Sequence, residues 1–220
     1  TDQFIVPDDI VDIAYKLDCK SLPLDHAWSL SQALQQALPW LAEDEHAGVH
    51  LIHVAESGNG WHRPDDPENG ILCLSKRTRM TLRIPKQRVA DAHQLTGKTL
   101  DVAGSPLTVK EGTIKLLSSL STLFARYVIS DAAMDEDAFL HRQAAQLRGM
   151  GIAVTKLLAG KQHTLRLPAG LVTTRSVMIA DLIPEQSVRL QQQGLGLGRK
   201  YGCGLFVPQK GIKPVGGENE

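Results

Sequence analysis

The densest pattern in this sequence of 220 residues is a glycine-rich stretch, Gly194-Leu195-Gly196-Leu197-Gly198-Arg199-Lys200-Tyr201-Gly202-Cys203-Gly204. It holds five of the 19 glycines and two adjacent cations. Glycine accepts positive φ and lets the backbone approach a ligand closely, so this stretch suits a phosphate or a nucleic-acid backbone. The alternative is a tight turn that packs on a sheet. The candidate binding residues are Gly196, Gly198, Arg199, Lys200 and Gly202.

Two familiar nucleotide motifs do not fit this stretch. A dinucleotide fingerprint follows a strand and opens a helix, whereas this stretch follows a predicted helix and opens a predicted strand. The phosphate-binding loop of nucleotide hydrolases needs Gly-Lys-Ser/Thr, which is absent here. An unrelated small-molecule enzyme that holds a coenzyme phosphate is therefore a weaker alternative.

Periodicity along the rest of the chain predicts the element order β-α-β-β-α-β twice. Residues 10–19 alternate as a strand with one buried face, and residues 26–38 have helical apolar spacing with Asp25 as the N-cap. Residues 56–69 predict a loop. The other predicted strands are 49–54, 71–74, 78–84, 99–117 (one or two strands), 123–129, 164–167, 172–179 and 205–207, and the other helices are 86–93, 135–147 and 184–193.

This order predicts an α+β fold of two tandem ferredoxin-like domains, at residues 1–120 and 121–220. The repeat lies in the order of the elements and not in the amino acids. The alternative is one mixed sheet without duplication.

The composition, 42% apolar and 22% charged, is that of a globular protein and excludes disorder and collagen. No apolar run approaches the roughly 20 residues that span a bilayer, and the polar opening predicts no signal peptide. Three distant cysteines, Cys19, Cys73 and Cys203, form neither a disulfide framework nor a zinc motif. We therefore expect a cytoplasmic protein with no metal and no cofactor.

The net charge is zero, but the charges are segregated. Residues 1–74 hold 3 basic and 13 acidic side chains, whereas residues 75–130 hold 10 basic and 3 acidic ones. Residues 75–88 alone carry six cations and no acid, including Lys76, Arg77, Arg79 and Arg83. On a strand Arg77, Arg79 and Arg83 share one face, which suits a groove that binds phosphates. The alternatives are a solvated edge strand, or acidic and basic segments that fold against each other.

The run QQQGLGLGRKYGCGLF at residues 191–206 resembles the closing glycine-rich loop of the CRISPR-associated endoribonucleases of the RAMP superfamily. Residues 158–182 resemble the preceding hairpin, and Leu30-Ser31-Gln32-Ala33-Leu34 resembles the first helix. Residues 6–60 resemble the myxobacterial-type subgroup. The resemblance implies two RNA-recognition-motif-like domains and metal-independent cleavage of precursor CRISPR RNA within the repeat. It also implies a 2′,3′-cyclic phosphate product and a guide RNA that stays bound and enters an effector complex.

Many family members carry a histidine where this chain has Ser31, and a lone serine is a poor base near neutral pH. We therefore consider the other candidates for proton transfer. His26 is the first choice, because it lies at the start of the predicted first helix, where the dipole favours a neutral imidazole. His50 and His53 point to opposite faces of a strand, so at most one of them faces a site. Lys161 and His163, beside the C-terminal hairpin, are candidates for RNA contact.

Three interpretations follow. The leading one is a metal-independent endoribonuclease that recognises a repeat RNA, with a stem-loop expected. The second is a non-catalytic repeat-binding subunit of a CRISPR effector complex, which Ser31 favours. The third is the unrelated small-molecule enzyme.

Overall fold

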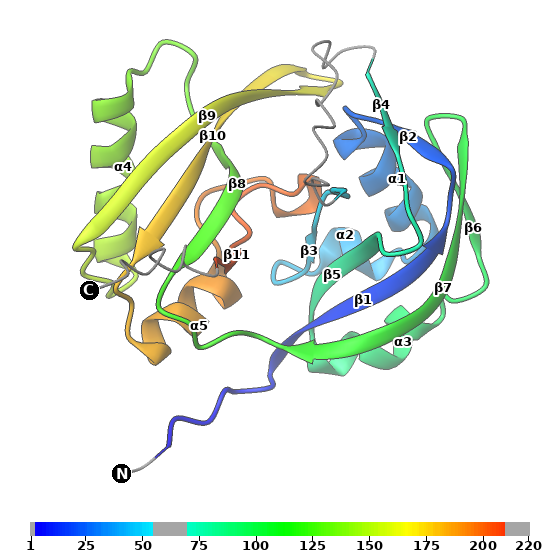
Figure 1. Cartoon of the computed structure of the whole chain (residues 1–220), viewed down its shortest axis with the longest axis horizontal. Helices are drawn as coiled ribbons and strands as arrows, with labels where there is room; N and C mark the ends of the chain where they lie inside the picture. The colour runs from blue at the N-terminus through cyan, green and yellow to red at the C-terminus, as the bar shows by residue number, and fades with distance from the viewer. Residues whose placement is uncertain (1–2, 55–69, 210–220) are drawn as a thin grey trace, which may run out of the picture.

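The computed structural model describes residues 3–54 and 70–209. In these residues the chain forms two main antiparallel sheets, which lie side by side (Figure 1). The loop predicted at 56–69 lies outside the described residues. The first unit contains β1 (Ile10–Asp18), β2 (Ser21–Pro23), α1 (Ala27–Ala37), α2 (Trp40–Glu43), β3 (Gly48–Val49), β4 (Ile71–Cys73), β5 (Arg79–Pro85), η1 (Lys86–Arg88), α3 (Val89–His93), β6 (Thr99–Val102) and β7 (Ser105–Leu116). The second contains β8 (Leu123–Ile129), α4 (Glu136–Gly149), β9 (Lys156–Leu167), β10 (Gly170–Ala180), α5 (Pro184–Gln193), η2 (Arg199–Tyr201) and β11 (Val207–Pro208).

Both sheets have the ferredoxin-like strand order. The first is ordered β3-β5-β1-β7-β6, with β6 and β7 as a hairpin, and the second is ordered β11-β8-β10-β9. The short strands β2 and β4 pair with each other outside these sheets. The predicted fold of two ferredoxin-like units is confirmed. The domain division at residues 120 and 121 falls within the connector 117–122 and stays a prediction.

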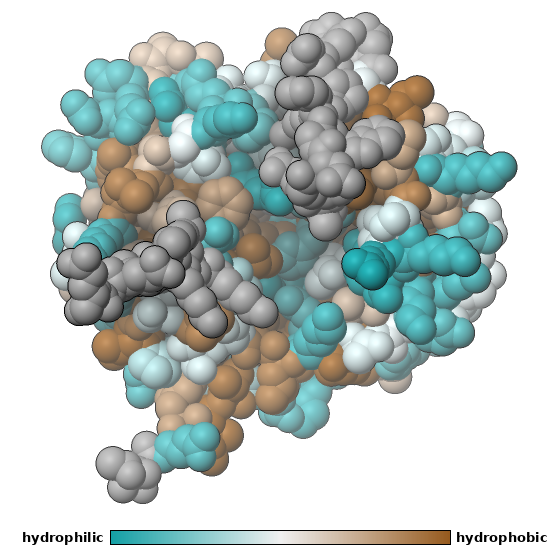
Figure 2. Space-filling view, in the orientation of Figure 1, coloured by the Kyte–Doolittle hydropathy of each residue, from teal (hydrophilic) through white to brown (hydrophobic). Residues whose placement is uncertain are grey.

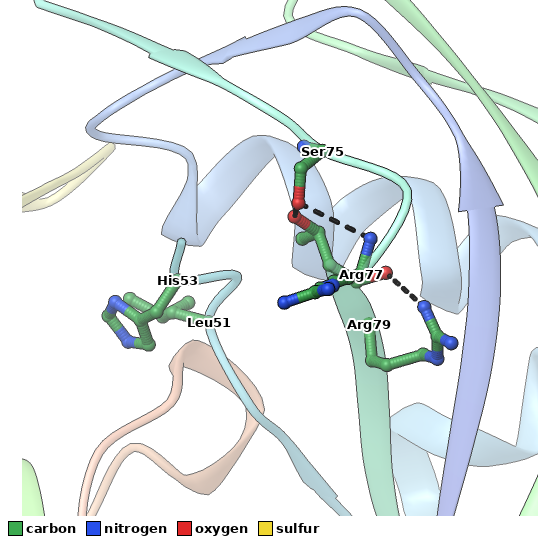
Figure 3. Close-up of a pocket in the computed structure, with 6 residues that line it drawn as sticks. Leu51, His53, Ser75, Arg77 and Arg79 are labelled. Carbon is green, nitrogen blue, oxygen red and sulfur yellow. Dashed lines mark hydrogen bonds between the residues drawn. The ribbon is translucent and has the colours of Figure 1, made fainter. Parts of the chain in front are cut away.

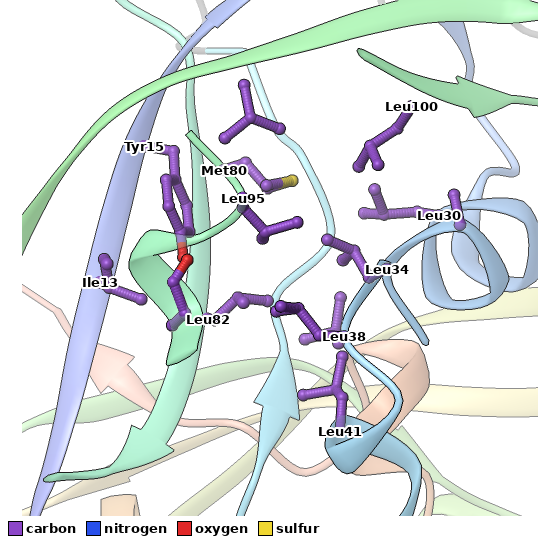
Figure 4. Close-up of a cluster of buried hydrophobic side chains, with 14 of the residues drawn as sticks. Ile13, Tyr15, Leu30, Leu34, Leu38, Leu41, Met80, Leu82, Leu95 and Leu100 are labelled. Atoms are coloured by element: carbon purple, nitrogen blue, oxygen red, sulfur yellow. The ribbon is translucent and has the colours of Figure 1, made fainter. Parts of the chain in front are cut away.

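Each sheet builds its own hydrophobic core. In the first unit Leu30 and Leu34, one helical turn apart on α1, are fully buried in a cluster with Tyr15 and Leu82 (Figure 4). The Tyr15 hydroxyl donates to the carbonyl oxygen of Ala92 at 2.6 Å, and burial raises its pKa above the ordinary value. Tyr15 is thus a core residue, as the alternation of the first strand predicts.

The second core joins both helices to the second sheet. Phe139 and Leu147 of α4 and Leu190 of α5 lie in one buried cluster with Ala125 and Val177 of the sheet. Across residues 3–54 and 70–209, no helix has the length and the apolar character needed to cross a membrane.

Two local predictions are wrong. The N-cap of α1 is His26, without a side-chain cap bond, because the carboxylate of Asp25 instead accepts a hydrogen bond from the backbone of Arg166 on β9 at 3.3 Å. The strand predicted at 49–54 ends at Val49, and His50 adds one last backbone hydrogen bond to Thr81 of β5, at 3.1 Å. As a result, His50 and His53 do not belong to one strand and lie in different surroundings.

Candidate functional site

Three aromatic rings meet between the two units: those of His53, Tyr127 and His163. His53 follows β3, Tyr127 lies on β8, and His163 lies on β9. The rings of His53 and Tyr127 stack, with centroids 5.8 Å apart and planes at 22°. His163 meets Tyr127 edge-on, with centroids 5.4 Å apart and planes at 70°. Tyr127 is buried, so this ring cluster presents one partly exposed imidazole from each unit.

Two surface pockets adjoin the ring cluster. The first is lined by Leu51, His53, Ser75, Arg77, Thr78 and Arg79. The second is lined by Leu24, Asp25, Leu51, Tyr127, Gln162, His163, Thr164, Leu165, Arg166 and Leu171. Leu51 lines both, so the two pockets share a wall. In the space-filling view the surface between the units is hollowed and carries polar side chains (Figure 2).

The loop before β5 brings cations to the first pocket. The backbone N–H of Arg77 donates to Ser75 Oγ at 3.3 Å, which holds the loop in shape. The side chain of Arg77 points toward His53 across the pocket (Figure 3). Arg79 turns away from His53 and donates to the carbonyl oxygen of Thr78 at 3.1 Å (Figure 3). It also donates to the carbonyl oxygen of Lys76 at 2.9 Å. Arg77 is therefore the cation that this loop directs toward the ring cluster.

Arg83 does not share the exposed face predicted for the basic run. It is 1% exposed, and its Nε and Nη2 donate to the two carboxylate oxygens of Asp12 at 2.8 and 3.1 Å. Its Nη1 donates to the carbonyl oxygens of Phe206 and Gln191, at 2.7 and 3.2 Å. The exposed position predicted for Arg83 is wrong, because all three nitrogens bind protein oxygens. RNA binding by Arg83 stays a prediction, which this burial disfavours. Arg83 instead joins β5 to the end of α5 and to the segment before β11.

Other cations of the basic run also pair with the acidic N-terminal segment. Lys86 pairs with Asp8, and Arg88 lies 3.7 Å from Asp44. Burial acts to raise the pKa of the Asp12 carboxyl, but the charge and hydrogen bonds of Arg83 outweigh it, so this pKa is lowered. The alternative that acidic and basic segments fold against each other therefore holds for this part of the run.

His26 lies at the start of α1, but the protein engages both of its ring nitrogens. Nε2 accepts a hydrogen bond from the backbone N–H of Ile52 at 3.0 Å, so Nδ1 carries the proton and donates to the carbonyl oxygen of Pro23 at 2.8 Å. The side chain is 2% exposed, and burial lowers its pKa. This geometry disfavours His26 as the general base, because proton transfer would first have to break a buried hydrogen bond, and the role of His26 stays a prediction.

Ser31 and His50 also line neither pocket. Ser31 is fully buried, and its Oγ accepts a hydrogen bond from the amide of Gln35 at 2.9 Å. His50 Nε2 lies 4.0 Å from the carboxylate of Asp12. Burial and the charge of nearby Arg83 lower the pKa of His50 to about 4. Of the catalytic candidates taken from the sequence, only His53 lies at the ring cluster.

The glycine-rich stretch packs between the units, as its turn alternative predicts. A Cβ at Gly202 would lie 2.5 Å from Leu51 Cγ, and one at Gly198 would lie 2.9 Å from the Cβ of Cys203. Both positions therefore need glycine for close packing, and Gly202 supports the shared wall at Leu51. Gly196 is exposed, with no atom within 4 Å of an added Cβ.

The two cations of this stretch bind backbone of the first unit. Lys200 Nζ donates to the carbonyl oxygens of Asp44 and Ala47, the latter at 2.8 Å. Arg199 Nη2 donates to the carbonyl oxygen of His46 at 3.0 Å. Their charged ends thus hold the connection between α2 and β3 and line neither pocket, which favours packing over RNA contact.

Sequence reasoning missed Tyr127, Gln162 and Arg166. Tyr127 is one apolar position of the alternating strand at 123–129, and nothing near it in the sequence points to an imidazole partner. His163 lies at the site as a neighbour of the ring cluster, whereas Lys161 is exposed on β9 and lines neither pocket. RNA contact by Lys161 stays a prediction.

The structure therefore belongs to the class of proteins with two tandem ferredoxin-like units, and it gathers histidines and cations between them. A family model described as Cas6 Crispr matches residues 11–211, and the chain belongs to this Cas6 family. The chain is 32% identical over 198 residues to the CRISPR-associated endonuclease Cas6 of Myxococcus xanthus (strain DK1622), which covers 90% of this chain and 81% of that protein. The resemblance predicted from residues 191–206 is confirmed.

Solved structures of low identity share the fold. A CRISPR associated protein Cas6 superposes with a TM-score of 0.64 at 11% identity, covering 91% of this chain and all of that one. A structure described as an RAMP protein binding different RNA substrates has a TM-score of 0.62 at 14% identity, covering 90% and 98%. Both support the architecture of two ferredoxin-like units.

Proposed function

We propose that this chain is an endoribonuclease that cleaves precursor CRISPR RNA within the repeat, without a metal ion, by attack of a 2′-hydroxyl on the adjacent phosphate. Its membership of the Cas6 family and its 32% identity to a CRISPR-associated endonuclease support this activity. The observation that carries the proposal is the ring cluster, where His53 and His163 lie against one tyrosine beside the basic loop.

The reaction needs a base, an acid and a cation. The base removes the 2′-hydroxyl proton while O2′ bonds to phosphorus, and the acid protonates O5′ while the bond from phosphorus to O5′ breaks. Histidine serves both roles because its ordinary pKa lies near 7. We assign His53 and His163 as this pair, Arg77 as the cation at the phosphate, and Tyr127 as the residue that positions both rings. The products are a 2′,3′-cyclic phosphate and a 5′-hydroxyl.

The proposal includes retention of the guide RNA and its passage to other subunits of a CRISPR effector complex. Exposed Lys76 and Lys161 support binding of the phosphate backbone beyond the cleaved position. A reducing cytoplasm is proposed as the setting, and the three free cysteines suit it. Retention predicts one turnover per protein molecule when RNA is in excess.

The direct test is incubation of the protein with the cognate repeat RNA in excess EDTA. We expect cleavage at one position with cyclic phosphate ends, and no cleavage when the attacking nucleotide carries a 2′-deoxyribose. Cleavage that requires Mg²⁺ would contradict the mechanism. Tight binding without cleavage would instead support the non-catalytic repeat-binding subunit, which Ser31 at the family's histidine position favours.

A further inference from the structure

The second pocket has a lining that the cleavage reaction does not need. Its lining is about equally apolar and polar, and the apolar part includes Leu24, Leu51 and Leu171. Its polar groups include the amide of Gln162 and the carboxylate of Asp25. Leu171 is 65% exposed at the start of β10, so its side chain is available to a ligand in this pocket. A pocket that combines leucine side chains with several polar groups suits a flat, partly polar molecule.

We propose that this pocket holds one unstacked nucleobase of the substrate RNA, adjacent to the cleaved phosphate. The inference rests on the proposed function and adds a site that selects the cleaved position. A nucleobase has two apolar faces and a polar edge, and proteins commonly recognise single-stranded RNA by burying such a base and bonding its edge. The leucines would cover the faces, and Gln162 and Asp25 would bond the edge.

The position of the pocket places its occupant beside the cleaved phosphate. His163 and Tyr127 line it, so its occupant lies next to the ring cluster. The first pocket, across the wall at Leu51, is lined by Arg77 and Arg79 and, among the described residues, by no carboxylate, so it suits a phosphate, whereas the lining of the second includes the carboxylate of Asp25 as well as Arg166. A chain that places its cleaved phosphate at the imidazoles thus has room for one flanking base in the second pocket.

The hydrogen bond of Asp25 to β9 supports a role of the pocket in recognising the edge of a base. Its Oδ2 accepts a hydrogen bond from the backbone N–H of Arg166 at 3.3 Å, which ties the carboxylate to β9. A carboxylate has several acceptor positions and can accept further hydrogen bonds, and the Gln162 amide both donates and accepts. Asp25 of the first unit therefore supplies hydrogen-bond acceptors to the edge of the base, and Gln162 of the second unit supplies a donor.

The test combines a filled pocket with a missing base. Leu171→Trp places a bulky ring at the pocket, and Leu158→Trp is its matched control, because Leu158 is 63% exposed on the same hairpin but lines neither pocket. The RNA probe is the repeat with a 2′-deoxyribose at the attacking nucleotide, intact or with an abasic residue at one of the two positions flanking the cleaved phosphate. Dissociation constants are measured for every pair of protein and RNA.

We expect an abasic residue at one flanking position to weaken binding to the wild type and to Leu158→Trp by about tenfold. Leu171→Trp should bind the intact RNA about tenfold more weakly than the wild type. For this variant, the abasic residue should raise the dissociation constant by less than about twofold over its own value for the intact RNA. Gln162→Ala should show the same reduced sensitivity without added bulk.

The inference is overturned if the abasic residue costs the wild type nothing at either position. It is also overturned if the cost is the same in Leu171→Trp as in the wild type. Both results are compatible with cleavage of the intact repeat, so they leave the proposed function in place. Failure of the wild type to bind or cleave the intact repeat would instead overturn the proposed function itself.

Discussion

The four candidate histidines differ in their surroundings and not in their chemistry. His26 has a hydrogen-bond partner on each ring nitrogen, and His50 lies beside Asp12 with its pKa lowered. His53 and His163 are partly exposed and line the two pockets. Position along the chain favours His26 as the base, because it lies at the start of a helix. His53 and His163, which contact Tyr127, are better placed for proton transfer, because they are partly exposed, whereas His26 is buried and bonded.

The stability of the protein at mildly acidic pH depends on His50. Burial and Arg83 lower its pKa from 6.5 to about 4 in the folded state, so the unfolded chain binds more protons between these values. The contribution of neutral, buried His50 to the free energy of unfolding is therefore fully present above pH 6.5 and is lost as the pH falls toward 4. From pH 7 to pH 5, we expect the free energy of unfolding of the wild type to fall by about 2 kcal/mol more than that of His50→Gln. Urea denaturation at both values checks this, and an equal pH dependence of the two proteins would refute it.

At the scale of elements, local signals predicted helix ends well and strand lengths poorly. The helix predicted at 184–193 is found with the same bounds, since Pro184 begins it and Gly194, with φ of +70°, ends it. The strand predicted at 164–167 extends over Lys156–Leu167 because β10 pairs with it along its whole length. The length of a strand thus depends on its partner, which lies elsewhere in the sequence.

Two alanine substitutions separate close packing from backbone strain in the glycine-rich stretch. Gly204 and Gly196 have similar φ, +70° and +77°, so alanine strains both backbones alike. A Cβ at Gly204 would lie 2.4 Å from the carbonyl oxygen of Leu195, whereas one at Gly196 meets nothing within 4 Å. We expect Gly196→Ala to cost about 1 kcal/mol of unfolding free energy and Gly204→Ala at least about 3 kcal/mol. Similar midpoints in chemical denaturation would argue against a packing role for the stretch.

Across the whole molecule, the fold was predictable from the sequence, and so were His53, His163 and Arg77 as separate candidates, but their meeting at one site was not. The order of elements follows from periodicity and turn residues, which are local. The contacts of Tyr127 with His53 and His163 depend on how two sheets pack, and no spacing in the sequence encodes that packing. The family resemblance pointed to the first helix, where this chain has Ser31, so it led away from the ring cluster.

The buried pair of Asp12 and Arg83 holds the two units together. Arg83 contacts Asp12 in the first unit and two carbonyl oxygens in the second. We expect Arg83→Ala to lower the free energy of unfolding by about 3–5 kcal/mol, because it leaves the Asp12 charge without its buried partner. Exposed Arg79→Ala is the control and should change it by less than about 0.5 kcal/mol. Equal losses in thermal or chemical denaturation would show that Arg83 is not a link between the units.

In the proposed mechanism, one histidine from each unit, His53 and His163, performs the proton transfers. The most direct measurement is the single-turnover rate of repeat cleavage in EDTA for His53→Ala, His163→Ala and His141→Ala, the last an exposed histidine on α4. We predict rates about 10²–10⁴-fold below the wild type for the first two, with unchanged RNA affinity, and a wild-type rate for the third. Wild-type rates in both His53→Ala and His163→Ala would contradict the account and place the catalytic groups elsewhere.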